Sequence, residues 1–69
     1  MTVLQQLVRL RVKHKLRQAD VARLMNVSRQ QIHNIESMRQ GFPSIHTLER
    51  YAKAAGARII VREKKANRK

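Results

Sequence analysis

The sequence of 69 residues has no cysteine, two glycines, one proline and two aromatic residues, Phe42 and Tyr51. The lack of cysteine excludes disulfides, thiol catalysis and zinc–thiolate sites, and it fits the reducing cytoplasm, where we expect the protein to be located. So few aromatic rings argue against a stacking platform for single strands or RNA loops. A chain of this length must therefore be held by a small apolar core, alone or with a second copy.

Long hydrophobic runs and acidic residues are scarce as well. The longest strongly apolar run is Ile59, Ile60 and Val61, which is too short for a membrane span or a secretory signal, so no membrane partner is expected. Sixteen Lys and Arg oppose four Asp and Glu, which gives a net charge of +12 spread along the whole chain. Such a charge predicts a polyanionic partner, and the scarcity of aromatic rings favours double-stranded DNA.

The histidines and carboxylates do not form a pattern typical of catalysis or metal binding. His14, His33 and His46 fall on three different predicted helices, and the four acidic residues are scattered. No pair has the spacing of a metal site or an acid–base pair. We therefore expect no enzyme activity, no metal and no cofactor.

Apolar residues at helical spacing predict two helices in the first part of the chain. Thr2 can cap the first helix, which is expected to end at about His14. The second covers about residues 18–25 and ends at Asn26, because asparagine tolerates the left-handed conformation found after helix ends. The residues expected to be buried in these helices are Leu4, Leu7, Val8, Val21, Ala22, Leu24 and Met25.

A third helix is specified at its start by two local signals. Ser28 and Gln31 form a capping-box pattern, and Val27 and Ile32 have the spacing of a hydrophobic staple. Ile32 and Ile35 are expected to face the interior. The residues left on the outer face are Arg29, Gln30, His33, Asn34 and Ser37.

A fourth helix and a strand are predicted to complete a single domain over residues 1–63. Ser44, after Pro43, opens the helix, whose apolar face holds Ile45, Leu48, Ala52 and Ala55, and Gly56 ends it. Residues 57–63 are rich in β-branched side chains and predict a strand. Because this chain offers the strand no partner, we expect a homodimer through Ile59, Ile60 and Val61. The basic tail, residues 64–69, is expected to be disordered.

The segment from Leu16 to Glu36 joins two short helices through a tight turn, as a helix-turn-helix requires. It resembles the phage-repressor-like (Cro and Xre type) helix-turn-helix family, and the resemblance extends from about Leu7 to Gly56. Residues that fit the family pattern are Leu16, Gln18, Val21, Ala22, Val27, Ser28, Ile32, Ile35 and Glu36. The resemblance and the predicted strand together imply a mostly α fold: a four- to five-helix lambda-repressor-like bundle with a short C-terminal β-strand.

The resemblance also implies a function and roles for particular residues. It implies a sequence-specific, repressor-like transcriptional regulator that places a recognition helix, residues 28–37, in the major groove of DNA. Its base contacts are expected from Arg29, Gln30, His33 and Asn34, because Arg suits guanine and Asn or Gln suits adenine. Expected phosphate contacts are Arg17, Gln18, Ser28, Gln31 and Arg39. Arg11 and Glu36 are expected to form a buried structural salt bridge.

The sequence departs from the family pattern at three positions. Arg17 replaces the usual hydroxyl or amide cap, Met38 replaces a glycine, and Pro43 comes about one residue late. The loop of residues 38–42 is therefore expected to be reshaped.

Two other function classes stay open from the sequence alone. The ending Gly-Ala-Arg-apolar-Val resembles HigA-like and HipB-like antitoxins, which would add a toxin protein as a partner besides operator DNA. An RNA-binding or structural nucleoid protein would share the charge but would need no ordered recognition face.

Overall fold

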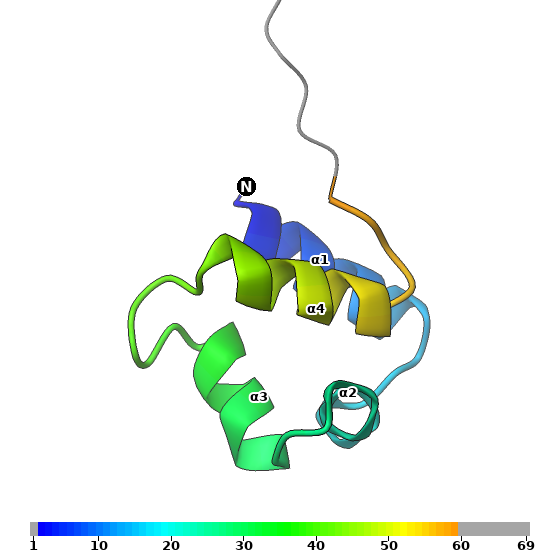
Figure 1. Cartoon of the computed structure of the whole chain (residues 1–69). Helices are drawn as coiled ribbons and strands as arrows, with labels where there is room; N and C mark the ends of the chain where they lie inside the picture. Colours follow the sequence, from blue (N-terminus) through cyan, green and yellow to red (C-terminus); the bar gives the residue numbers. More distant parts are fainter. Residues whose placement is uncertain (1, 60–69) are drawn as a thin grey trace, which may run out of the picture.

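The computed structural model describes residues 2–59, which form four helices (Figure 1). These are α1 (Val3–Lys13), α2 (Gln18–Met25), α3 (Arg29–Glu36) and α4 (Ile45–Ala54). In Figure 1, α1 and α4 lie side by side as one layer, and α2 and α3 lie below them. The described part of the chain is therefore all-α, and the four predicted helices are confirmed.

Side-chain oxygens bind the backbone at the start of each helix. Thr2, Ser28 and Ser44 each accept a hydrogen bond from the N–H three residues on, at 3.1, 3.0 and 3.2 Å. Arg17 offers no such oxygen at the start of α2, as its sequence predicts. There the carboxylate of Asp20 accepts from the Arg17 backbone N–H at 2.8 Å instead, so this helix start keeps half of a capping box.

All four helices end with a residue in the left-handed conformation. These residues are Lys15, Asn26, Met38 and Gly56, with φ angles of 61°, 60°, 56° and 79°. In each case the next residue donates its N–H to the carbonyl oxygen five residues earlier, at 2.7 to 3.0 Å. Met38 thus takes a left-handed backbone conformation that glycine adopts most readily. The reshaped loop of residues 38–42 stays a prediction.

The core fills the space between the two layers. Its buried residues are Leu4, Leu7, Val21, Ala22, Met25, Ile32, Ile35, Leu48, Tyr51, Ala52 and Ala55. Two residues expected inside are exposed: Leu24 by 61% and Ile45 by 56%. Leu24 lies outside the stripe through Val21, Ala22 and Met25, and Ile45 is the first residue of α4, at the rim of the core. Both predictions were wrong because neighbouring apolar residues already complete the inward faces.

The predicted strand does not form in the residues that the structure describes. Residues 57–59 have no regular secondary structure, and Ile59 is partly buried against the core. A strand needs a neighbouring strand for its backbone hydrogen bonds, and residues 2–59 of a single chain supply none. The remaining residues of the predicted strand, Ile60 and Val61 among them, lie outside the described residues.

The left-handed Met38 gives a stability prediction. We expect Met38→Gly to raise the free energy of unfolding by about 0.5–1 kcal/mol, because glycine avoids the steric penalty of a side chain at positive φ. Met38→Ala shortens the same side chain but keeps the Cβ atom, so it should not raise the free energy of unfolding. Urea unfolding of the three proteins measures this, and equal stability of the two variants would contradict it.

Candidate nucleic-acid interface

The carboxylate of Glu36, the last residue of α3, is bound by side chains from the other three helices. Arg11 of α1 donates from Nε to Oε2 at 2.7 Å and from Nη2 to Oε1 at 3.1 Å. Gln18 of α2 donates from Nε2 to Oε1 at 3.1 Å, and the hydroxyl of Tyr51 on α4 donates to Oε2. We call these four residues the Glu36 cluster. It connects all four helices at one point.

Little water reaches the Glu36 cluster. The side chains of Arg11 and Glu36 are only 13% and 10% exposed. Burial acts to lower the pKa of Arg11, but the hydrogen bonds and negative charge of Glu36 raise it overall. Burial raises the pKa of the Tyr51 hydroxyl, and its bond to Glu36 raises it further. The arginine therefore stays charged, the tyrosine stays neutral, and both act as donors to the carboxylate.

The side of α3 opposite Ile32 and Ile35 carries polar side chains without a carboxylate. Arg29, Gln30 and His33 are exposed, and Asn34 is half-buried. Nε2 of Gln30 donates to Oδ1 of Asn34 at 3.0 Å, one helical turn away. The structure therefore brings the four predicted base-contacting residues together on one face, which we call the α3 outer face.

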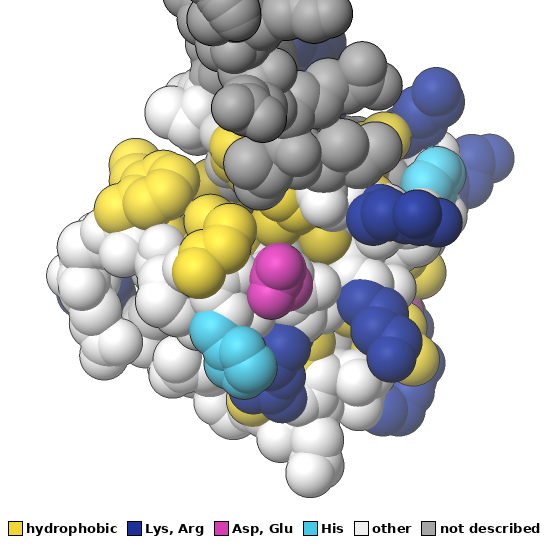
Figure 2. Space-filling model, turned by 45° about the horizontal axis from the view of Figure 1, so that its top comes forward, with side chains coloured by type: hydrophobic (Ala, Val, Ile, Leu, Met, Phe, Trp, Pro, Cys, Tyr) yellow, Lys and Arg dark blue, Asp and Glu magenta, His cyan; other side chains and the backbone are white. Residues whose placement is uncertain are grey.

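Exposed cations occur at the start of α2, within α2 and on the loop after α3. Arg17 and Arg23 both bind the carboxylate of Asp20, with closest N–O distances of 3.2 and 3.3 Å, and their side chains are 80% and 73% exposed. Hydrogen bonds from Arg17, more than its charge, lower the pKa of Asp20 to about 2. Arg39 is exposed on the loop. Figure 2 shows Lys and Arg side chains on one side of the displayed face and a hydrophobic patch on the other.

Two of the remaining predicted phosphate contacts, Gln18 and Ser28, have hydrogen-bond partners within the protein. The amide of Gln18 belongs to the Glu36 cluster, and the hydroxyl of Ser28 caps α3 through the N–H of Gln31. The side chain of Gln31 is half-buried. Contact of these three residues with phosphate stays a prediction.

A family model described as a helix-turn-helix domain matches residues 4–63. The chain belongs to this family. Comparison with curated proteins gives no significant match, and comparison with solved structures gives none either. In this helix-turn-helix domain, α2 and α3 are the two helices and Asn26 lies in the turn between them. The family is a DNA-binding one, so DNA is the partner that the family implies.

The sequence did not predict Tyr51 of the Glu36 cluster or Arg23, an ion-pair partner of Asp20. Tyr51 is three residues after the buried Leu48, so the helical period places it on the buried face of α4. A buried tyrosine needs a hydrogen-bond partner for its hydroxyl, and this need is the signal in the sequence. Arg23 is three residues after Asp20, a spacing that favours ion pairs on a helix. Neither signal shows from sequence alone which helices meet.

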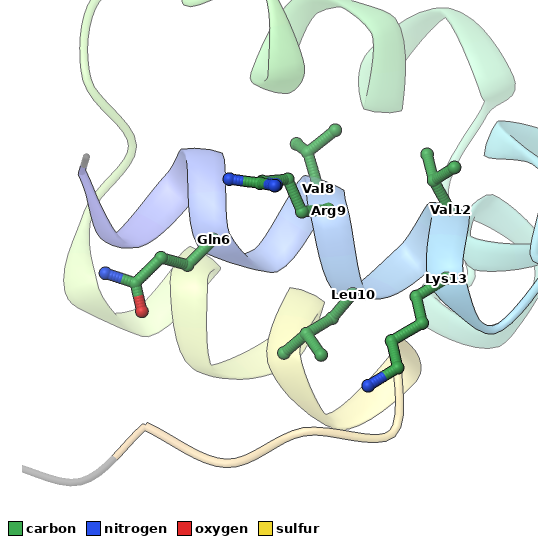
Figure 3. Close-up of a pocket in the computed structure, with 6 residues that line it drawn as sticks. All are labelled: Gln6, Val8, Arg9, Leu10, Val12 and Lys13. Atoms are coloured by element: carbon green, nitrogen blue, oxygen red, sulfur yellow. The ribbon is translucent and has the colours of Figure 1, made fainter.

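A shallow hollow of about 640 Å³ lies along α1 of this helix-turn-helix domain (Figure 3). In Figure 3, Gln6, Leu10 and Lys13 point to one side of α1 and Val8, Arg9 and Val12 to the other. Its described lining has two cations and no carboxylate or imidazole.

The described residues contain neither a metal-binding cluster nor a membrane-spanning helix. Between residues 2 and 59, no group of three His, Cys, Asp or Glu side chains could hold a metal ion. No helix within this part of the chain is long and apolar enough to cross a membrane.

The Glu36 cluster gives a second stability prediction. We expect Glu36→Gln to lower the free energy of unfolding by about 3 kcal/mol, because it leaves the Arg11 guanidinium without its counter-charge. Tyr51→Phe, which removes one donor to the carboxylate, should cost about 1.5 kcal/mol and keep the variant folded.

Glu49→Gln is the matched control, because Glu49 is exposed on α4. We expect a change below about 0.5 kcal/mol for this variant. Chemical denaturation compares the series, and a loss for Glu36→Gln no larger than that of the control would contradict the assigned role.

Proposed function

We propose that this helix-turn-helix domain is a sequence-specific double-stranded DNA-binding transcriptional regulator of the repressor-like type. The recognition helix is α3 with its two capping residues, residues 28–37, and it enters the major groove. Arg29, Gln30, His33 and Asn34 contact base edges. The protein acts as a homodimer, with one recognition helix for each half-site.

The observation that carries this proposal is the segregation of side chains on α3. Ile32 and Ile35 face the core, and Glu36 is bound inward by the other helices. The α3 outer face is left with donors and acceptors and no negative charge to repel phosphate. An α-helix fits the major groove, where each base pair presents its own pattern of donors and acceptors.

Phosphate contacts fix the position of the recognition helix on the duplex. We assign them to Arg17, Gln18, Ser28, Gln31 and Arg39. Arg17 and Arg39 are exposed cations. In the sequence, Arg17 comes before α2 and Arg39 comes after α3. The charge of +12 adds a general attraction to duplex DNA of any sequence, and salt weakens this attraction.

Selection of bound duplexes from a random pool, followed by titration of variants, tests the proposal. We expect Arg29→Ala and Asn34→Ala to change preference at particular base pairs, each by about 5- to 150-fold. Arg17→Ala should weaken binding to all duplexes alike and lower the salt dependence by about one counterion.

Lys53→Ala is the matched control for Arg29→Ala, since it also removes an exposed cation, but from α4. It should leave base preference unchanged. Sequence-specific reading by α3 would be refuted if Arg29→Ala and Asn34→Ala each weakened binding to every duplex by the same factor.

The homodimer is tested separately. We expect the pair of changes Ile60→Asp and Val61→Asp to abolish dimerisation, because charge would replace the apolar surface of the proposed dimer strand. Ile59 stays unchanged, since it packs on the core. Ala66→Asp and Asn67→Asp add the same two negative charges beyond this strand and serve as the control. Sedimentation velocity with and without duplex measures the state, and a native monomer in both conditions would contradict the proposal.

A further inference from the structure

Gln30 and Asn34 are joined on the α3 outer face by a side-chain hydrogen bond. They are four residues apart, so their side chains lie one above the other on the helix. Nε2 of Gln30 donates to Oδ1 of Asn34 at 3.0 Å. Asn34 is half-buried and also lines a hollow between α3 and the loop that follows, whereas Gln30 is exposed. The shorter and more enclosed amide thus holds the longer and more exposed one.

The direction of this bond determines which polar groups each amide contributes to a ligand. An amide has one carbonyl oxygen and one NH₂ group. The bond uses one of the two N–H donors of Gln30 and one of the two lone pairs on the oxygen of Asn34. The groups that this bond leaves entirely unused are the oxygen of Gln30, which is an acceptor, and the NH₂ group of Asn34, which is a donor. Two side chains joined in this way present the donor–acceptor set of a single amide.

We propose that Gln30 and Asn34 act as one composite reader of a single adenine in each half-site. The inference rests on the proposed function and adds to it the base that these residues select. In the major groove adenine presents N7 as an acceptor and N6–H₂ as a donor. Nδ2 of Asn34 donates to N7, and Oε1 of Gln30 accepts from N6. The bond between the side chains orders both amides before DNA binds, which lowers the entropy cost of recognition.

The same arrangement disfavours the other bases. Guanine presents two acceptors, N7 and O6, so its O6 would face the acceptor Oε1 of Gln30. Thymine presents an acceptor and a methyl group, and cytosine presents a donor without the adjacent N7. A lone Asn or Gln could also bind adenine, but it would do so independently of its neighbour. Interdependence of the two residues at one base is therefore the property to measure.

The experiment starts from the selected half-site and changes each base pair in turn. Affinities are measured for the native protein, Gln30→Ala, Asn34→Ala and the double variant. We expect the native protein to prefer adenine at one position by about 10- to 100-fold. Each single variant should lose most of that preference at the same position, and the double variant should lose no more. Asn34→Asp, which replaces the donor with an acceptor, should abolish the preference without removing volume.

Gln6→Ala controls for the loss of an exposed amide, because Gln6 is on α1. It should leave the preference for adenine intact. The composite reader is refuted if the two single variants affect different base positions, or if their shared position prefers another base, although sequence-specific binding as such would then stand. A native protein without any base preference would overturn both this inference and the proposed function.

Discussion

The arrangement of the helices depends on one largely enclosed carboxylate, that of Glu36. In a protein with a net charge of +12 it is a rare negative group, and α1, α2 and α4 each direct a donor to it. Burial of a charge is unfavourable unless hydrogen bonds and a counter-charge offset it, and the Glu36 cluster supplies both. Arg11 extends the cluster by donating from Nη1 to the backbone oxygen of Leu16 at 2.7 Å, in the turn before α2.

This constraint matters because α3 has only eight residues. An isolated helix of this length is not stable in water, so its position comes from tertiary contacts. Ile32 and Ile35 attach it to the core, and Glu36 fixes its C-terminal end. The helical period then places Arg29, Gln30, His33 and Asn34 on the other side. The same eight-residue pattern thus determines both the contacts that attach α3 to the core and the side chains that α3 exposes.

Several features could be predicted because their causes are local. Hydroxyl caps at Thr2, Ser28 and Ser44 satisfy N–H groups within one turn, so the starts of three helices are visible in the sequence. The same holds for the left-handed Asn26 that ends α2. Local patterns predicted burial less well than helix ends. Leu24, which was expected to be buried, is exposed. An apolar residue at the edge of an amphipathic stripe packs inward only if another element covers it.

The sequence by itself determined the four helices, their caps and the polar, carboxylate-free outer face of α3, because these follow from hydrogen bonds within a turn and from the helical period. Only the tertiary structure decided that Gln18 and Tyr51 join Arg11 on Glu36, since these residues lie 15 to 25 positions away along the chain. It also left residues 57–59 of a single chain without regular secondary structure. Both outcomes depend on which partner lies near in space, and side-chain chemistry alone does not specify that.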